Sequence, residues 1–184
     1  MKKIFVFFHT AILMLMINSS YAQVRSLGHP THIFFEYGPL VKVPDASVSK
    51  NGSHFSAGIK RHTWIEDRPI QIEVDLNYRS ISFYDSIDVQ KKVGMGEMYI
   101  GPRLLISKTS PLYPTVSVLG GGYLNFGPVG GLSALVSFGI YYNFTEPKTP
   151  RNGCSIEITY HTARIKFDGF TIPPAFALRI GFFF

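Results

Sequence analysis

Residues 70–79 read Ile-Gln-Ile-Glu-Val-Asp-Leu-Asn-Tyr-Arg, an unbroken alternation of apolar and polar side chains. A period of two over ten residues predicts a β-strand with one apolar and one polar face. Ten residues is also the length of a tilted strand that crosses a bilayer, about 9–11 residues. Glu73 and Asp75 lie near the centre of the stretch, where a charge facing lipid would be costly. We therefore expect the polar face to point into a barrel and the apolar face to point toward lipid.

The same alternation recurs along the chain and predicts seven further strands. These are residues 32–43, 54–63, 97–107, 113–126, 132–144, 154–165 and 174–184. An even number of strands closes an antiparallel barrel and leaves no unpaired edge in lipid. The sequence therefore predicts an all-β fold, an eight-stranded antiparallel transmembrane β-barrel.

The last eleven residues, Pro174 to Phe184, carry an apolar stripe that ends on an aromatic side chain. Phe176, Phe182 and Phe184 lie on one face of this predicted strand, and Arg179 lies on the other. The stripe resembles the closing strand of bacterial outer-membrane β-barrels, and the whole pattern resembles the OmpA-type eight-stranded barrels. The resemblance implies a place in the outer membrane of a Gram-negative bacterium. It also implies contact with outer-membrane lipid and lipopolysaccharide, and recognition of the last strand by the barrel-assembly machinery.

The N-terminus has the features of a cleaved signal peptide. Lys2 and Lys3 precede an apolar stretch over residues 4–17, and Ser20-Tyr-Ala22 offers small residues at a cleavage site. We expect a signal peptide at residues 1–22 and one barrel domain at residues 23–184. The mature chain would keep a formal net charge of +4, which is no signature of nucleic-acid binding.

Alternation alone does not say which face is inside, so a soluble eight-stranded barrel is the alternative architecture. In a soluble barrel the polar faces would meet water and should be rich in Lys and Glu. Here they contain many small residues, such as Ser133, Ser137 and Gly139, which suit a crowded interior. The composition of the polar faces favours the membrane barrel.

The connections between the predicted strands suggest an orientation. If both termini are periplasmic, residues 65–69, 108–112 and 146–153 form periplasmic turns, and residues 44–53, 84–96, 127–131 and 166–174 form outer loops. Four aromatic residues fall at the proposed periplasmic ends of strands and predict an interfacial girdle: Trp64, Tyr113, Phe144 and Phe184.

The predicted inward faces carry charges of both signs. They include Lys60, Glu73, Asp75, Arg79, Arg103, Glu157 and Arg179. The interior of an eight-stranded barrel is just wide enough for its own side chains, so these acids and bases should pair and plug the lumen. A small gated channel is the alternative reading of the same charges.

Glu157, Thr159 and His161 share one face of the predicted strand at residues 154–165. An acid, a hydroxyl and an imidazole are the residue types of a hydrolytic triad. Their position resembles the lipid A 3-O-deacylase barrels, which carry a His-x-Ser-Asn element on this strand. If His161 matches the family's His, Ala163 stands at the nucleophile position and Arg164 at the Asn position. The resemblance therefore implies the architecture and argues against the activity.

The histidines provide no recognisable metal motif along the sequence. His29, His32, His54 and His62 have no Cys or carboxylate partner at ligand spacing, so we expect no metal and no cofactor. Cys154 is the only cysteine, which excludes an internal disulfide. We expect a non-enzymatic outer-membrane barrel with a structural or surface-interaction role. A deacylase-like hydrolase is the alternative, and the chain makes no prediction of oligomeric state.

Overall fold

The computed structural model describes residues 31–40, 50–62, 69–84, 89–106, 111–125, 130–144, 152–163, 165–167 and 170–184. The predicted signal peptide at residues 1–22 and the girdle residue Trp64 lie outside these described residues. No helix in the described part of the chain is long and apolar enough to cross a membrane.

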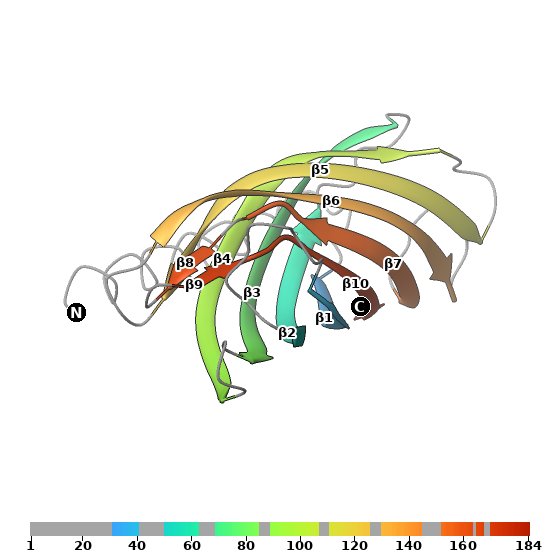
Figure 1. The fold of residues 1–184 in the computed structure, drawn as a ribbon. Helices are drawn as coiled ribbons and strands as arrows, with labels where there is room; N and C mark the ends of the chain where they lie inside the picture. Colours follow the sequence, from blue (N-terminus) through green and yellow to red (C-terminus); the bar gives the residue numbers. More distant parts are fainter. Residues whose placement is uncertain are drawn as a thin grey trace.

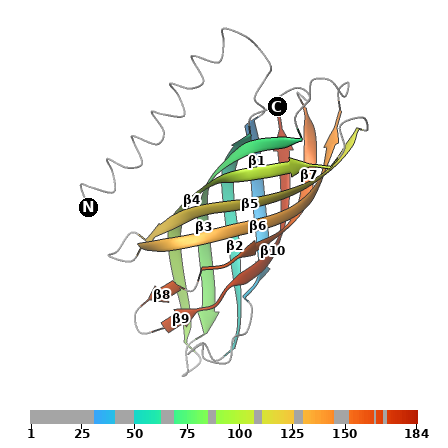
Figure 2. The same cartoon turned by 90° about the horizontal axis from the view of Figure 1, so that it is seen from above.

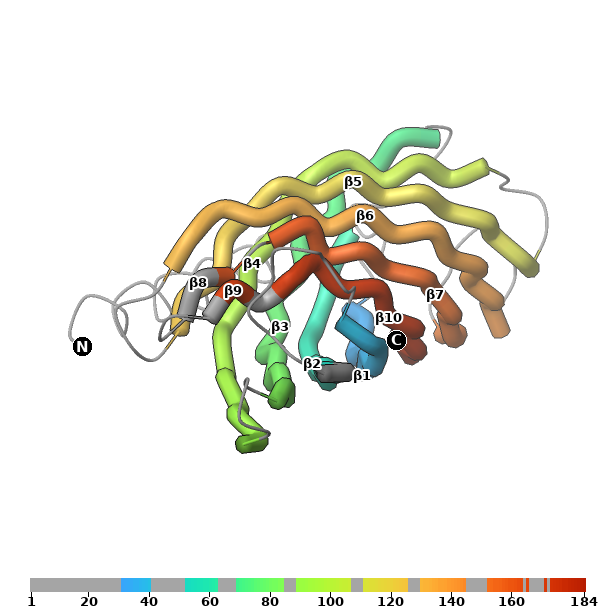
Figure 3. The backbone as a smooth tube through the Cα atoms, viewed as in Figure 1, coloured from blue at the N-terminus to red at the C-terminus, as the bar shows by residue number. Residues whose placement is uncertain are grey.

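Eight strands form one closed antiparallel barrel, which confirms the predicted fold. They are β1 (Thr31–Pro39), β2 (Lys50–His62), β3 (Ile70–Tyr84), β4 (Gln90–Leu105), β5 (Leu112–Asn125), β6 (Gly130–Asn143), β7 (Gly153–His161) and β10 (Ala175–Phe183). Their order around the wall is β1-β10-β7-β6-β5-β4-β3-β2, so the first strand closes the barrel against the last. In Figure 1 the blue β1 lies beside the dark red β10. The tube in Figure 3 shows the wall passing in sequence order from β2 to β6.

The closure places both described termini at one end of the barrel, which we call the terminus end. There the backbone N–H of Thr31 donates to the carbonyl of Phe184 at 3.2 Å, and the N–H of Phe184 donates back at 3.2 Å. A small hairpin, β8 (Ile165–Phe167) and β9 (Phe170–Ile172), lies at the other end, which we call the far end. Figure 2 shows this hairpin and the C-terminus at opposite ends.

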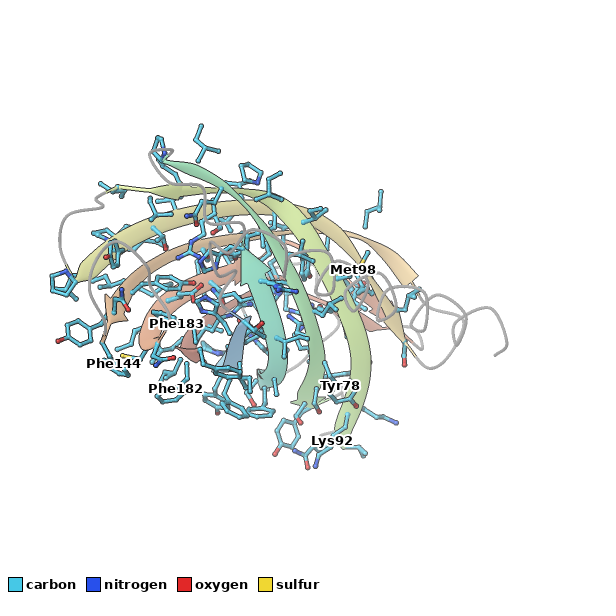
Figure 4. All side chains as sticks on the ribbon, turned by 180° about the vertical axis from the view of Figure 1, so that it is seen from behind. Tyr78, Lys92, Met98, Phe144, Phe182 and Phe183 are labelled. Carbon is cyan, nitrogen blue, oxygen red and sulfur yellow. The ribbon has the colours of Figure 1, made fainter. Side chains whose placement is uncertain are left out.

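Burial alternates along the strands, most regularly in β1, β3, β7 and β10. In β10, every second side chain from Ala175 to Phe183 is buried, and Phe176, Leu178, Ile180 and Phe182 between them are exposed. Figure 4 shows the neighbours Phe182 and Phe183 on opposite sides of this strand; they are 54% and 4% exposed. The outer face of the wall is largely apolar, and the middle of the interior is polar. This outer surface contradicts the soluble-barrel alternative, because in a soluble barrel the exposed apolar side chains would face water.

β3 and β4 extend well beyond the predicted strands. Much of the predicted outer loop at residues 84–96 is wrong, because residues 90–96 pair with β3. The reason is a reversal of the pattern. Beyond Arg79 the buried side chains are apolar, as at Ile81 and Phe83, and the outward ones are polar, as at Ser82. The prediction assumed that the apolar face points outward along the whole strand, so it ended the strand where the pattern reverses.

β7 is shorter than the predicted strand at residues 154–165 and ends at His161. At the next residue the pairing with β6 becomes irregular: the N–H of Thr162 still donates to the carbonyl of Ala134 at 3.0 Å, but the N–H of Ala134 donates to Oγ1 of Thr162 at 2.9 Å. Residues 165–167 then pair with residues 170–172 outside the barrel wall. Part of the predicted outer loop at residues 166–174 is therefore a short hairpin.

Candidate functional site

The lumen of the barrel is the candidate site, because it concentrates charge out of contact with water. Nine charged side chains point inward and are at most 2% exposed: Glu36, Lys60, Glu73, Asp75, Arg79, Glu97, Arg103, Glu157 and Arg179. A buried charge is costly unless it is paired and hydrogen-bonded. The partners of these nine groups decide what the lumen can do.

One group of charges is centred on Glu157 of β7. Its Oε1 lies 2.5 Å from Nζ of Lys60, on β2, and accepts from the hydroxyl of Tyr141 at 2.8 Å. Lys60 also lies 3.9 Å from Glu73 of β3, and Nε of Arg103 lies 3.6 Å from the other oxygen of Glu73. The guanidinium of Arg103 lies over the Tyr141 ring, 3.9 Å from its centroid. These contacts connect side chains from five strands.

A second group is centred on Glu36 of β1. Nε of Arg179 donates to Oε2 of Glu36 at 2.9 Å, and Nη1 of Arg179 donates to Oδ2 of Asp75 at 2.7 Å. The other oxygen, Oε1, lies 2.5 Å from Nε2 of His161 and 3.1 Å from Nε2 of His54. Two imidazoles and one arginine thus converge on a single carboxylate.

Arg79 and Glu97 form a third buried pair, between β3 and β4. Nη2 of Arg79 lies 2.5 Å from Oε1 of Glu97. The second oxygen of Glu97 lies 3.8 Å from Nδ1 of His161, so this pair adjoins the Glu36 group. The described lumen therefore holds five carboxylates against four Lys and Arg side chains.

Clusters of buried apolar side chains flank the charges along the barrel. One cluster gathers residues from the terminus ends of the strands: Leu105, Tyr113, Tyr141 and Phe183. Another gathers residues near the far end: Ile81, Phe83, Val93, Met95, Tyr123, Ala163 and Ile165. The charged groups lie in the middle of the barrel between these two clusters.

The structure places all seven predicted lumen charges inside and joins them in ion pairs. Sequence reasoning missed Glu36 and Glu97 as members of this set. Glu36 stands between Phe35 and Tyr37 and did not look like part of a charged face. Glu97 lay at the edge of the predicted loop. Its parity with Arg103 along β4 was the signal that could have found it.

The three candidate catalytic residues point inward but do not form a triad. Glu157 binds Lys60, and His161 binds Glu36 instead of Glu157. The hydroxyl of Thr159 donates to the backbone carbonyl of Ala177 at 3.5 Å. At the position of the family's nucleophile, Ala163 has no hydroxyl and is 5% exposed. The geometry gives this face no activated nucleophile.

The predicted girdle residues fall on different faces. Phe144 and Phe184 are 61% and 64% exposed at the terminus end. The prediction for Tyr113 is wrong, because its side chain is 2% exposed and lies in the apolar cluster inside the barrel. Tyr113 shares the parity of Thr115 and Ser117, which also face inward. Strand parity decides the face, and position at a strand end does not.

Comparison with solved structures places the fold among known barrels. Neisserial surface protein A is similar over 84% of this chain and 94% of that one, at 13% identity and a TM-score of 0.60. The outer-membrane protein OprG of Pseudomonas aeruginosa is similar over 87% of this chain and 99% of that one, at 11% identity and a TM-score of 0.56. This chain has the fold of the small bacterial outer-membrane β-barrels. No family model and no curated protein matches its sequence.

Proposed function

We propose that this chain is an outer-membrane barrel protein with a plugged lumen and a structural or surface-interaction role, and that it catalyses no reaction. The observation that carries the proposal is the buried network of ion pairs between two apolar clusters. Lys60, Glu73, Arg103 and Glu157 contact one another across the barrel at distances from 2.5 to 3.9 Å. Moving an ion through such a network would separate buried charges from their partners, which is strongly unfavourable.

The orientation and partners follow from the outer surface. We infer that the terminus end is periplasmic and that Phe144 and Phe184 contribute to an aromatic girdle at that interface. The outward apolar side chains of the strands, which we call the apolar belt, contact outer-membrane lipid and lipopolysaccharide. The outward apolar side chains of β10 are the element that the assembly machinery recognises. The far end, with the β8–β9 hairpin, then faces the cell surface and is the part available for interaction.

Conductance in planar bilayers tests the plug. Refolded protein is expected to insert without producing single-channel steps under an applied potential. A double variant, Lys60→Ser with Glu157→Ser, removes the shortest ion pair of the group centred on Glu157. This variant is expected to raise the leak current. Reproducible steps from the unmodified protein would overturn the plugged lumen in favour of a channel, whatever the variant does.

A further inference from the structure

The side chains of Glu36, His54 and His161 meet in the lumen although they are far apart in the sequence. They come from β1, β2 and β7, and all three are at most 1% exposed. One donor atom from each lies within 4.8 Å of the others. We propose that these three residues bind one divalent transition-metal ion of the zinc class inside the barrel.

The donor set suits this class of ion. Two imidazole nitrogens and one carboxylate oxygen are a common ligand combination for zinc, which binds nitrogen and oxygen at about 2.0–2.2 Å. Two ligands of one ion therefore lie no more than about 4 Å apart. Oε1 of Glu36 already lies 3.1 Å from Nε2 of His54. Side-chain rotations that move the donor atoms by less than about 1 Å would bring all three donors close enough together to bind one ion.

The tautomer of His161 gives an independent reason to place a cation there. Nδ1 of His161 and Oε2 of Glu97 are both buried, have no hydrogen-bond partner and lie 3.8 Å apart. A carboxylate beside Nδ1 favours the tautomer that carries the proton on Nδ1, which leaves the lone pair on Nε2. That lone pair then faces Oε1 of Glu36, which is also an acceptor, at 2.5 Å. Two acceptors at this distance repel each other unless a proton or a metal ion neutralises the contact.

The groups around the three ligands provide the usual second layer of a metal site. Nε of Arg179 holds Oε2 of Glu36 at 2.9 Å, which orients the carboxylate so that Oε1 faces the two imidazoles. The hydroxyl of Ser56 lies 3.1 Å from the same Oε1. Hydrogen bonds of this kind fix ligand orientation, and their loss weakens metal binding by about 10–100-fold.

The charged side chains around the site carry a net negative charge, which a cation would balance. Glu36, Asp75 and Glu97 contribute three negative charges, and Arg79 and Arg179 contribute two positive ones. A single proton on one imidazole would also balance this difference, so it is the competing occupant. A proton and a metal ion differ in a measurable way, because only the metal ion is detected by elemental analysis and by X-ray absorption.

The experiment uses the untagged full mature chain, with Zn²⁺ added before refolding because the site is buried. After loosely bound metal is removed by dialysis against a weak chelator, elemental analysis is expected to find one Zn²⁺ per barrel. His54→Gln and His161→Gln should each abolish this retention, and Glu97→Gln should weaken the affinity by about 10–100-fold. His32→Gln is the matched control, because His32 is 0% exposed in the same lumen but belongs to a different cluster, beside His62 and Phe183.

X-ray absorption at the zinc edge keeps the proposal falsifiable if the variants do not fold. The unmodified protein is expected to show two imidazoles and one oxygen ligand at about 2.0–2.2 Å. Absence of stoichiometric zinc, retention in His54→Gln and His161→Gln that is unchanged from the unmodified protein, or a spectrum without imidazole would each overturn the site. None of these results would by itself show that the lumen is open, so the metal site can be disproved without disproving the plugged lumen.

Discussion

Arg179 of β10 donates Nη1 to Asp75 of β3 at 2.7 Å, across a sequence separation of 104 residues. The two strands are not neighbours, because β1 and β2 lie between them in the wall. The same guanidinium donates Nε to Glu36 of β1 at 2.9 Å and lies over the ring of Phe34. One side chain thus spans the lumen and ties the closing strand to the opposite part of the wall.

Replacing Arg179 should therefore destabilise the whole barrel. Arg179→Met keeps much of the volume but removes the cation that pairs with the buried carboxylates of Asp75 and Glu36, and we expect a loss of about 3–5 kcal/mol in the free energy of unfolding. Urea unfolding in lipid vesicles, followed by the heat-modifiable shift on gels, measures this loss. Lys92→Ala is the control, since Lys92 is exposed at the far end of β4, and it should change stability by less than about 0.5 kcal/mol. Equal stability of the two variants would contradict a structural role for the network.

The apolar belt predicts a charge penalty that depends on position. Leu178 is 51% exposed near the middle of β10, so Leu178→Arg should cost about 2–4 kcal/mol in a bilayer. Ser82 also faces outward, but it lies in the part of β3 where the outer face has become polar. Ser82→Arg should cost about 0–1 kcal/mol. Unfolding of both variants from vesicles locates the edge of the membrane, and equal costs would mean that the belt extends over the far end.

Much of the fold could be predicted from the sequence because a barrel strand has only two faces. Once Glu73 and Asp75 had to point inward, parity assigned the faces of residues 70–79 and of the strands that alternate in the same way. Parity could not predict that the apolar face turns inward beyond Arg79, where the interior of the barrel becomes an apolar cluster. Parity also could not predict the end of β7 at His161, next to which Oγ1 of Thr162 is the acceptor for the N–H of Ala134.

The partners within the lumen were beyond prediction for a geometric reason. Which inward residues meet depends on the tilt and stagger with which the sheet closes. Glu36 binds His161 from 125 positions away, and spacing along the chain carries no sign of this contact. The predicted row of Glu157, Thr159 and His161 was a correct assignment of face. It was a poor guide to contact, because each of the three binds a group on another strand.

The hydrolase alternative has a direct test. Refolded protein incubated with lipopolysaccharide should release no 3-hydroxy fatty acid, because Ala163 offers no nucleophile and Thr159 donates to a backbone carbonyl. Mass spectrometry of the released acids measures the outcome. Release that disappears in His161→Ala would contradict the non-enzymatic proposal, whereas release that persists in this variant would point to a contaminating esterase.

Close contact between β1 and β10 predicts a steric limit on Gly38. A Cβ atom at this position would overlap the carbonyl oxygen of Phe176 and the Cα of Ala177, which are backbone atoms that cannot rotate away. Gly38→Ala should therefore destabilise the barrel by about 1–3 kcal/mol, as overpacking does in other tightly packed interiors. Gly120→Ala is the matched control, because a Cβ atom there would meet nothing within 4 Å. Parallel urea titrations of both variants in vesicles measure the difference. If Gly38→Ala unfolds at the same urea midpoint as Gly120→Ala, β1 and β10 are not packed as closely as the structure shows.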